Sequence, residues 1–257
     1  MTNPTFSICV YCGSRPGDQP GFIEAARATG RWIGEHGGQL VYGGGRSGLM
    51  GEVAEATRQA GGRVVGVIPQ ALVDKELANH ACDELHIVQT MHERKAMMAE
   101  RSDAFVALPG GIGTFEELFE VWTWRQLRYH DKPIGLLNVD GYYDSMLQFL
   151  QTCVGHGFMG EWQMGLIESG SDIPTLLQSL VAGSRTAHHV HAPEIDLNGD
   201  EAQVIRAVQD RAVFGSGVAV TGYGHYTERW VRQAGQRKLA SLRLAHLITD
   251  VSQPGAG

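Results

Sequence analysis

Short apolar runs alternate with longer amphipathic stretches over about the first 180 residues of the chain. The runs are rich in β-branched residues and predict strands at 6–11, 39–42, 63–68, 84–88, 104–107, 133–138 and, more weakly, 165–168. Apolar positions at helical spacing predict helices near 21–35, 48–60, 92–100, 115–129, 142–155 and 173–181. This alternation predicts an α/β fold, a doubly wound, Rossmann-like parallel sheet with helices on both faces. Ligands of such sheets bind at the carboxyl ends of the strands.

The pattern changes after about residue 183. Residues 187–193 resemble a linker, and the stretches 201–214 and 227–249 have apolar positions that fit a helix. We therefore expect a Rossmann-like domain at 1–187 and a mostly helical C-terminal extension at 188–257. The apolar stripe of 227–249 must pack against either its own domain or a second subunit.

Composition and charge disfavour several classes of partner. The chain has 257 residues, of which 43% are hydrophobic, so it can bury a large core. Its net charge of -7 disfavours a nucleic-acid groove or an anionic membrane as partner. No apolar run approaches the ~20 residues of a membrane span, and no leader pattern opens the chain. These features predict a cytoplasmic protein.

The cysteines at 9 and 12 have the spacing of a redox or metal motif. Both lie in or beside the apolar run 6–11. We therefore favour small buried residues of a first strand over redox or metal chemistry.

The most informative segment is 109–117, where a strand ends, three glycines follow and a helix begins. The turn carries few side chains, because residues 110, 111 and 113 are Gly110, Gly111 and Gly113. The free N–H groups and the positive end of the helix dipole then suit an anion such as phosphate. We call residues 109–114 the cradle. Glu117 lies one helical turn beyond Thr114, where its carboxylate could act on the group attached to the bound phosphate.

Further glycine-rich loops follow other strands on the same edge, at Gly13-Ser14 and at 43–51. A Walker phosphate loop requires a lysine after its last glycine, but Leu49 stands there. The dinucleotide fingerprint requires GxGxxG after the first strand, and 13–17 lacks it. Both of these nucleotide-binding classes are therefore disfavoured.

A second segment, 91–98, opens the helix after the fourth strand. Its Arg94 and Lys95 are hydrogen-bond donors suited to phosphate or carboxylate. Each could be an ordinary surface cation, but the neighbouring 109–114 cradle favours a role in the site.

Three segments together closely resemble the LOG (Lonely Guy) family: 43–51, 91–95 and the PGGxGTxxE motif of 109–117. The resemblance covers residues 6–180 and implies a cytokinin riboside 5′-monophosphate phosphoribohydrolase. Such an N-glycosidase cleaves nucleoside 5′-monophosphates, here AMP and N6-substituted adenine analogues, into free base and ribose 5-phosphate.

The resemblance also implies roles for individual residues. Glu117 would stabilise the ribose cation and deprotonate water, and Arg94 would orient the ribose and Glu117 or polarise the base. A neighbouring cation would also keep Glu117 ionised at neutral pH. The residues expected to bind the nucleotide or its phosphate are Gly13, Ser14, Gly44, Gly45, Met91, Lys95, Gly110, Gly111, Gly113 and Thr114.

The resemblance implies no cofactor or metal, and it implies a homodimer or an assembly of dimers. Residues 122–124 fit either a dimer surface or an ordinary helix core. Arg15 stands where many members have serine, and it would add a phosphate contact or alter base preference. The extension would strengthen a dimer, cover the pocket or bind a partner.

Two alternatives remain open. A nucleotide or molybdenum-cofactor carrier on the same fold needs only the glycine loops. Many bacterial members carry a lysine decarboxylase label, but only four lysines occur, and none is placed like a pyridoxal Schiff base.

Overall fold

The computed structural model describes residues 4–75, 77–182, 187–190, 194–213, 219–233 and 236–252. The chain forms two compact units, 1–181 and 182–257. Each unit contains its own β-sheet.

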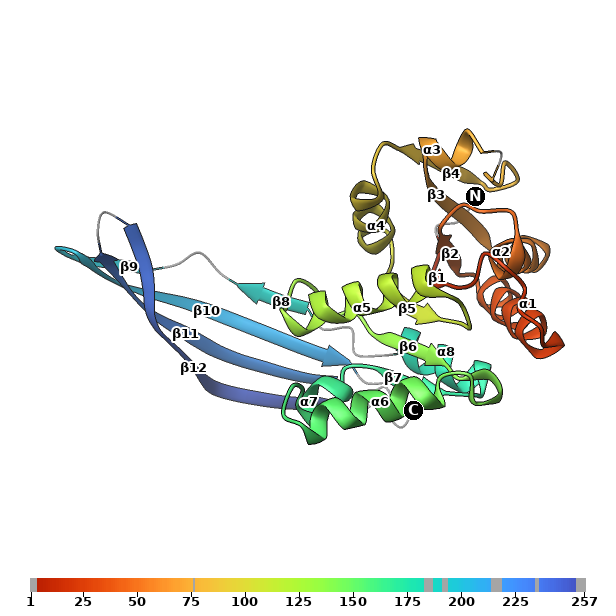
Figure 1. Ribbon diagram of the computed structural model, residues 1–257. Helices are drawn as coiled ribbons and strands as arrows, with labels where there is room; N and C mark the ends of the chain where they lie inside the picture. Colours follow the sequence, from red (N-terminus) through yellow and green to blue (C-terminus); the bar gives the residue numbers. More distant parts are fainter. Residues whose placement is uncertain are drawn as a thin grey trace. The chain divides into compact units, whose positions relative to one another are not determined.

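The first unit is built on a sheet of seven parallel strands in the order β4-β3-β2-β1-β5-β6-β7. From β1 the chain runs outward to β4 and then returns to β5 on the other side of β1. The point where the strand order reverses therefore lies between β1 and β5, in the middle of the sheet (Figure 1). The strands are β1 Ser7–Tyr11, β2 Gln39–Tyr42, β3 Arg63–Pro69, β4 Glu84–Val88, β5 Ala104–Ala107, β6 Ile134–Leu137 and β7 Glu168–Gly170.

Helices connect these strands. They are α1 Pro20–Glu35, α2 Gly48–Gln59, α3 Gln70–Val73, α4 Met91–Glu100, α5 Ile112–Gln126, η1 Val139–Gly141, α6 Asp144–Gly155, α7 Glu161–Met164 and α8 Ile173–Ala182. The sequence pattern predicts all of them except the short α3, η1 and α7. The helix at 112–126 begins three residues earlier than expected, so Gly113 and Thr114 belong to its first turn.

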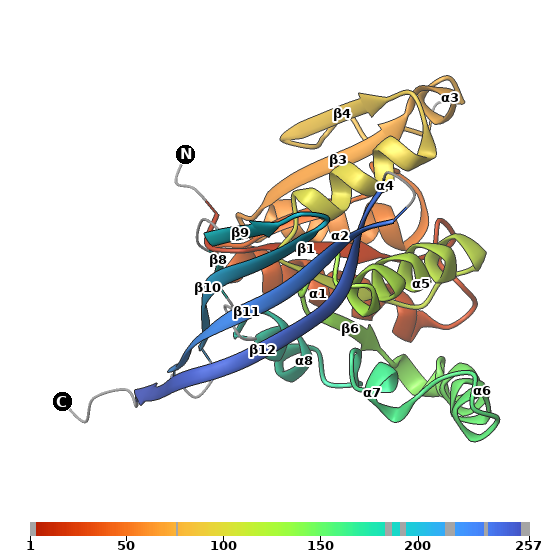
Figure 2. The ribbon, with the colours of Figure 1, turned by 90° about the vertical axis from the view of Figure 1, so that its left-hand side faces the viewer.

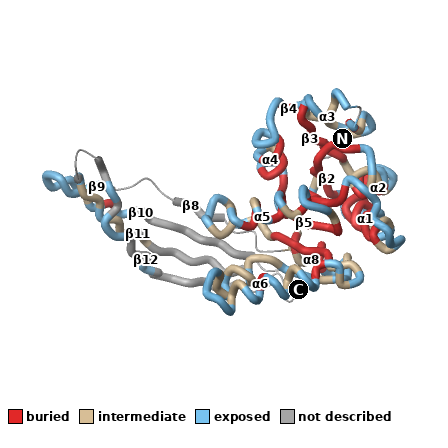
Figure 3. Tube along the Cα trace, in the orientation of Figure 1, coloured by how far each residue is buried: buried red, intermediate tan, exposed pale blue. Residues whose placement is uncertain are grey.

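Two hydrophobic clusters cover the two faces of this sheet. One joins alternate residues of the strands to α1, α2 and α8. The other joins the intervening strand residues to α4, α5 and α6. Buried residues accordingly follow the central strands and the inner helix surfaces (Figure 3). The predicted doubly wound α/β fold is thus confirmed.

The second unit is an antiparallel sheet of five strands, in the order β12-β11-β10-β8 with β9 also on β10. Its strands are β8 Ala187–Val190, β9 Glu194–Asn198, β10 Glu201–Val213, β11 Ala219–Gln233 and β12 Gln236–Ser252, as Figure 2 shows. The prediction of a mostly helical extension was therefore wrong.

The error has a definite physical cause. Val204, Val208 and Ala212 are spaced by four residues. That spacing places residues on one side of a helix, but four is also a multiple of two, so it places them on one face of a strand. The choice between the two is then decided by long-range pairing. Ala202 to Val213 lie opposite residues of β11 in continuous antiparallel register.

The linker expected at 187–193 was wrong in part. Residues 187–190 form β8 and pair with β10. Residues 191–193 lie outside the described part of the chain. Within that described part, no helix is both long and apolar enough for a bilayer crossing.

Candidate active site

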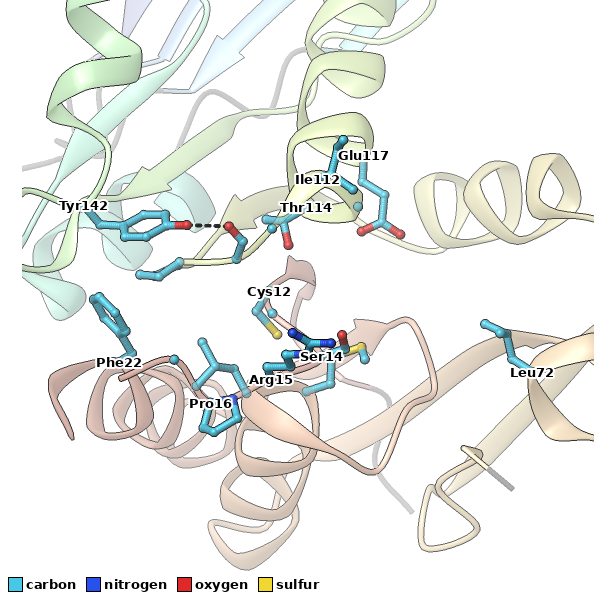
Figure 4. A pocket seen from close by; sticks show the side chains of 18 of the residues that line it. Cys12, Ser14, Arg15, Pro16, Phe22, Leu72, Ile112, Thr114, Glu117 and Tyr142 are labelled. Carbon is cyan, nitrogen blue, oxygen red and sulfur yellow. Dashed lines mark hydrogen bonds between the residues drawn. The ribbon is translucent and has the colours of Figure 1, made fainter. Parts of the chain in front are cut away.

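A cavity of about 660 Å³ opens where the strand order of the first unit reverses. Loops after β1 and β5 and the first turns of α5 form much of its wall, and the rest comes from α1, α2, α3, α4 and the residue after η1. Its lining residues are Cys12, Gly13, Ser14, Arg15, Pro16, Gly17, Phe22, Leu49, Met50, Leu72, Arg94, Pro109, Gly110, Gly111, Ile112, Gly113, Thr114, Glu117 and Tyr142. Figure 4 shows Thr114 and Glu117 projecting from α5 into this space, with Ser14 and Arg15 on the opposite wall.

The loop after β5 and the first turn of α5 have the geometry that the glycine pattern predicts for an anion cradle. The first intrahelical bond of α5 runs from Phe115 N–H to Gly111 O, at 3.1 Å. The three preceding amides of the helix therefore have no intrahelical acceptor, and they lie at the positive end of the dipole. Thr114 adds a hydroxyl in the same turn.

Close packing joins this cradle to the loop after β1. Gly13 N–H donates to Pro109 O at 3.1 Å. A Cβ at Gly110 would lie 2.1 Å from Thr114 Oγ1 and 2.9 Å from Gly13 N, so no larger residue fits. By contrast, a Cβ at Gly111 or Gly113 would meet no protein atom within 4 Å. Glycine at these two positions leaves open space rather than avoiding a clash within the protein.

Arg94 and Glu117 form a buried ion pair at the edge of the cavity. Arg94 Nη1 lies 3.1 Å from Glu117 Oε1, and the two side chains are only 10% and 11% exposed. Arg94 Nε also donates to the Val67 carbonyl at 3.1 Å. A Cβ at Gly43 would lie 1.9 Å from Arg94 Nη2, so the guanidinium can occupy this position only because residue 43 is glycine.

A capping box fixes the start of α4 and therefore the position of Arg94. Thr90 Oγ1 accepts from Glu93 N–H at 3.1 Å, while Glu93 Oε2 accepts from Thr90 N–H at 3.3 Å. Such reciprocal bonds satisfy N–H groups that a helix start leaves free. Arg94 consequently lies in the first turns of α4, directed across to α5.

Burial raises the pKa of Glu117, and the neighbouring Glu116 and Glu120 raise it further. Arg94 and Lys95 counteract this effect but do not cancel it. The expected neighbouring cation is therefore present and lowers the pKa of Glu117, although desolvation raises that pKa by more. Glu117 is consequently a stronger proton acceptor than an exposed glutamate.

Lys95 is not among the residues that line the cavity. Its ammonium forms ion pairs with Glu116 and, at 3.0 Å, with Glu120. The expected role as a phosphate donor does not fit this position. The sequence shows a cation beside the motif, but not that carboxylates 21 and 25 residues away hold it.

Three other expected binding residues also lie outside the lining. Gly44 adopts φ +70°, a conformation suited to glycine, and a Cβ at Gly45 would lie 2.7 Å from Met50. Met91 places its sulfur 3.9 Å from Arg94 Nη1. By contrast, Gly13, Ser14, Gly110, Gly111, Gly113 and Thr114 line the cavity.

Tyr142 is a cavity residue that the sequence did not indicate. Its hydroxyl donates to the Gly110 carbonyl at 2.5 Å, and its ring meets that of Phe22 edge-on (Figure 4). It follows η1, outside any recognised motif. Only the tertiary fold brings it to the cradle.

Burial bears on two alternatives that the sequence leaves open. Cys9 and Cys12 are buried free thiols, and burial raises the pKa of Cys9 to about 12. Trp122 is 3% exposed and donates to the Gln163 carbonyl, so it belongs to the helix core, whereas Thr123 is exposed and a dimer surface at 122–124 stays a prediction.

The fold and the cavity define a Rossmann-like α/β protein with an anion cradle beside a buried ion pair. A family model described as "Possible lysine decarboxylase" matches residues 50–180. A probable cytokinin riboside 5′-monophosphate phosphoribohydrolase of Oryza sativa subsp. japonica is 51% identical over 67% of this chain and 76% of its own length. A cytokinin riboside 5′-monophosphate phosphoribohydrolase of Arabidopsis thaliana is 47% identical over 67% and 81%. The chain belongs to this phosphoribohydrolase family, as the motifs indicate.

Two further comparisons concern the fold and the second unit. A molybdenum cofactor binding protein from Rippkaea orientalis aligns with a TM-score of 0.53 at 20% identity, over 69% of this chain and 95% of its own. A Moco carrier protein from Chlamydomonas reinhardtii aligns with a TM-score of 0.53 at 22% identity, over 70% and 99%. At these identities the likeness shows the fold alone. A SnoaL-like domain model matches residues 154–243.

Proposed function

We propose that this protein hydrolyses the N-glycosidic bond of nucleoside 5′-monophosphates, namely AMP and N6-substituted adenine analogues such as cytokinin riboside monophosphates. The observation that carries the proposal is the buried Arg94–Glu117 pair beside the α5 cradle in one cavity. Relatives at about 50% identity bear the name of this activity.

The cradle would hold the 5′-phosphate. The α5 amides and the Thr114 hydroxyl supply donors, and Arg15 on the opposite wall supplies a positive charge. The open space at Gly111 and Gly113 admits the phosphate oxygens close to the backbone. The substrate is thereby anchored at one end before its sugar reaches the ion pair.

Breaking the C–N bond at the anomeric carbon gives the ribose the character of an oxocarbenium ion. The Glu117 carboxylate stabilises that charge and takes a proton from the attacking water. The water oxygen bonds to the anomeric carbon. The electron pair of the broken C–N bond leaves with the base, which is protonated from solvent. The products are free base and ribose 5-phosphate.

Arg94 would hold Glu117 in place and keep it charged. Without its partner, the carboxylate would be a buried, uncompensated charge. The guanidinium is fixed in turn by the Val67 carbonyl. Arg94 is thus held from two sides while it faces the cavity.

The 188–257 extension is proposed to be a separate domain, since residues 1–142 contain every lining residue of the cavity. We also propose a homodimer or an assembly of dimers acting in the cytoplasm, where the free thiols of the chain would remain reduced.

The second candidate is a nucleotide or molybdenum-cofactor carrier. It is favoured only by the fold of the two carrier proteins above. A carrier requires the cradle but has no use for a buried glutamate with a raised pKa. A lysine decarboxylase is less compatible still, because no lysine is among the described residues that line the cavity.

The test is release of free base from AMP and from isopentenyladenosine monophosphate, followed by chromatography. Wild-type protein should release base from at least one of them. Glu117→Gln and Arg94→Ala should each reduce turnover by about 10³-fold or more, while circular dichroism stays unchanged. Tight AMP binding without base release would instead support the carrier.

A further inference from the structure

Two neighbouring helices of the first unit carry matched charges that the proposed mechanism uses only in part. Helix α4 presents two consecutive buried cations, Arg94 and Lys95, each 8% exposed. Helix α5 presents three carboxylates. Arg94 pairs with Glu117, while Lys95 pairs with Glu116 and Glu120.

Lys95 is a buried cation, which is stable only where carboxylates compensate its charge. Its side chain is 9% exposed, and removing an ammonium from water is costly unless it is paired. Glu116 and Glu120 are four residues apart and therefore lie on one face of α5. Glu120 also depends on this lysine, because its Oε2 is buried without a hydrogen-bond partner.

We propose that Lys95 is a positioning residue, which locks α5 against α4 through Glu116 and Glu120 and so keeps Glu117 aligned with Arg94 and shielded from two like charges. This inference rests on the hydrolase function proposed above. It assigns Lys95 an electrostatic role behind the cavity rather than a contact with phosphate.

The charges around Glu117 define the expected direction of change. On α4, Arg94 and Lys95 lower its pKa; on α5, Glu116 and Glu120 raise it. The groups of β1 and the residue after it that face Glu117 are Cys9, Tyr11 and Cys12, whose pKa values burial raises, so they stay neutral at working pH. Removing Lys95 should therefore raise the pKa of Glu117, and removing the charge of Glu120 should lower it.

The experiment compares the acidic limb of kcat/KM for Lys95→Met and Glu120→Gln. Glu117 must be ionised to act, so activity is lost as the pH falls through its pKa. Lys95→Met should move this limb to higher pH and reduce kcat/KM by about 10-fold or more. Glu120→Gln should move it to lower pH. Lys95→Arg should restore much of the wild-type profile, and the exposed Lys75→Met serves as the matched control.

A loss of packing alone would reduce activity in both variants without opposite shifts. Limbs that stay in place, or that move in the same direction, would therefore overturn the proposal. If Lys95→Met does not fold, the shift of the acidic limb in Glu120→Gln still decides the direction.

A second measurement tests the electrostatic role of Lys95 independently of the proposed hydrolase activity. Carboxyl titration by NMR of glutamate-labelled protein, with Glu117 assigned through Glu117→Gln, follows the same pKa without any substrate. Opposite shifts in a protein that hydrolyses no nucleotide would uphold the electrostatic role and refute the activity. If the variants leave the pKa of Glu117 unchanged in an enzyme that hydrolyses nucleotides, the activity is upheld and the electrostatic role of Lys95 is refuted.

Discussion

The substitution Gly43→Ala tests the site with a single methyl group outside the cavity lining. A Cβ at this position would lie 1.9 Å from Arg94 Nη2, whereas ordinary contact begins near 3.4 Å. The guanidinium must therefore move away by about 1.5 Å. Its 3.1 Å contacts with Glu117 and with the Val67 carbonyl cannot both survive such a shift.

The expected loss is large in activity and small in stability. A misplacement of about 1 Å can cost about 10²-fold in rate, which corresponds to about 2.7 kcal/mol of transition-state stabilisation. The clash involves the far end of a flexible side chain rather than backbone. The free energy of unfolding should therefore fall by only about 1–3 kcal/mol, the cost of one disturbed buried hydrogen bond.

The assay is adenine release from AMP, with thermal unfolding measured on the same samples. Gly155→Ala is the matched control, because a Cβ there meets nothing within 4 Å at the end of α6. Gly43→Ala with wild-type kcat/KM and an intact fold would refute the claim that the Arg94 position matters.

Other predictions follow from the cradle and the core. Thr114→Val should raise the KM for AMP about 10-fold with little change in kcat, because one hydrogen bond to a charged phosphate is lost; steady-state kinetics would show it, and an unchanged KM would exclude the contact. Tyr142→Phe removes the hydroxyl bond to the Gly110 carbonyl and should lower the free energy of unfolding by about 1 kcal/mol in urea titration, while wild-type stability would contradict the 2.5 Å bond. Leu118→Ala empties a fully buried position and should cost about 2–5 kcal/mol, measured likewise, whereas a loss below 1 kcal/mol would contradict its packing. A chain ending at Ala182 should fold and keep kcat within about threefold in the same AMP assay, and inactivity would show that the extension takes part.

The sheet of the first unit was predictable from sequence because the five strands between its two edges are buried on both faces. They therefore appear as continuous β-branched runs, and β2, β4 and β5 have the predicted bounds. The extension lacks this signal. Its long antiparallel strands carry apolar residues at spacings that both periods share, and pairing partners many residues away decide the outcome.

The cavity likewise contains residues that the sequence motifs identify and residues that only the fold identifies. Arg94 and Glu117 are in motifs, and the structure brings them to 3.1 Å. Lys95 is in the same motif, yet it faces away from the cavity toward Glu116. Tyr142 is in no motif, yet it contacts the cradle. Sequence spacing indicates which residues share an edge of the sheet, but side-chain direction depends on the packing of α4 against α5.

The empty space around Gly111 and Gly113 has a consequence for how this protein can fail. An added methyl at either position touches no protein atom, and at Gly113 it would favour the helix. Under the proposed function, substitutions there would block phosphate binding and abolish activity while the protein stays folded. The abundance of such a variant in cells would then not reveal that its activity is lost.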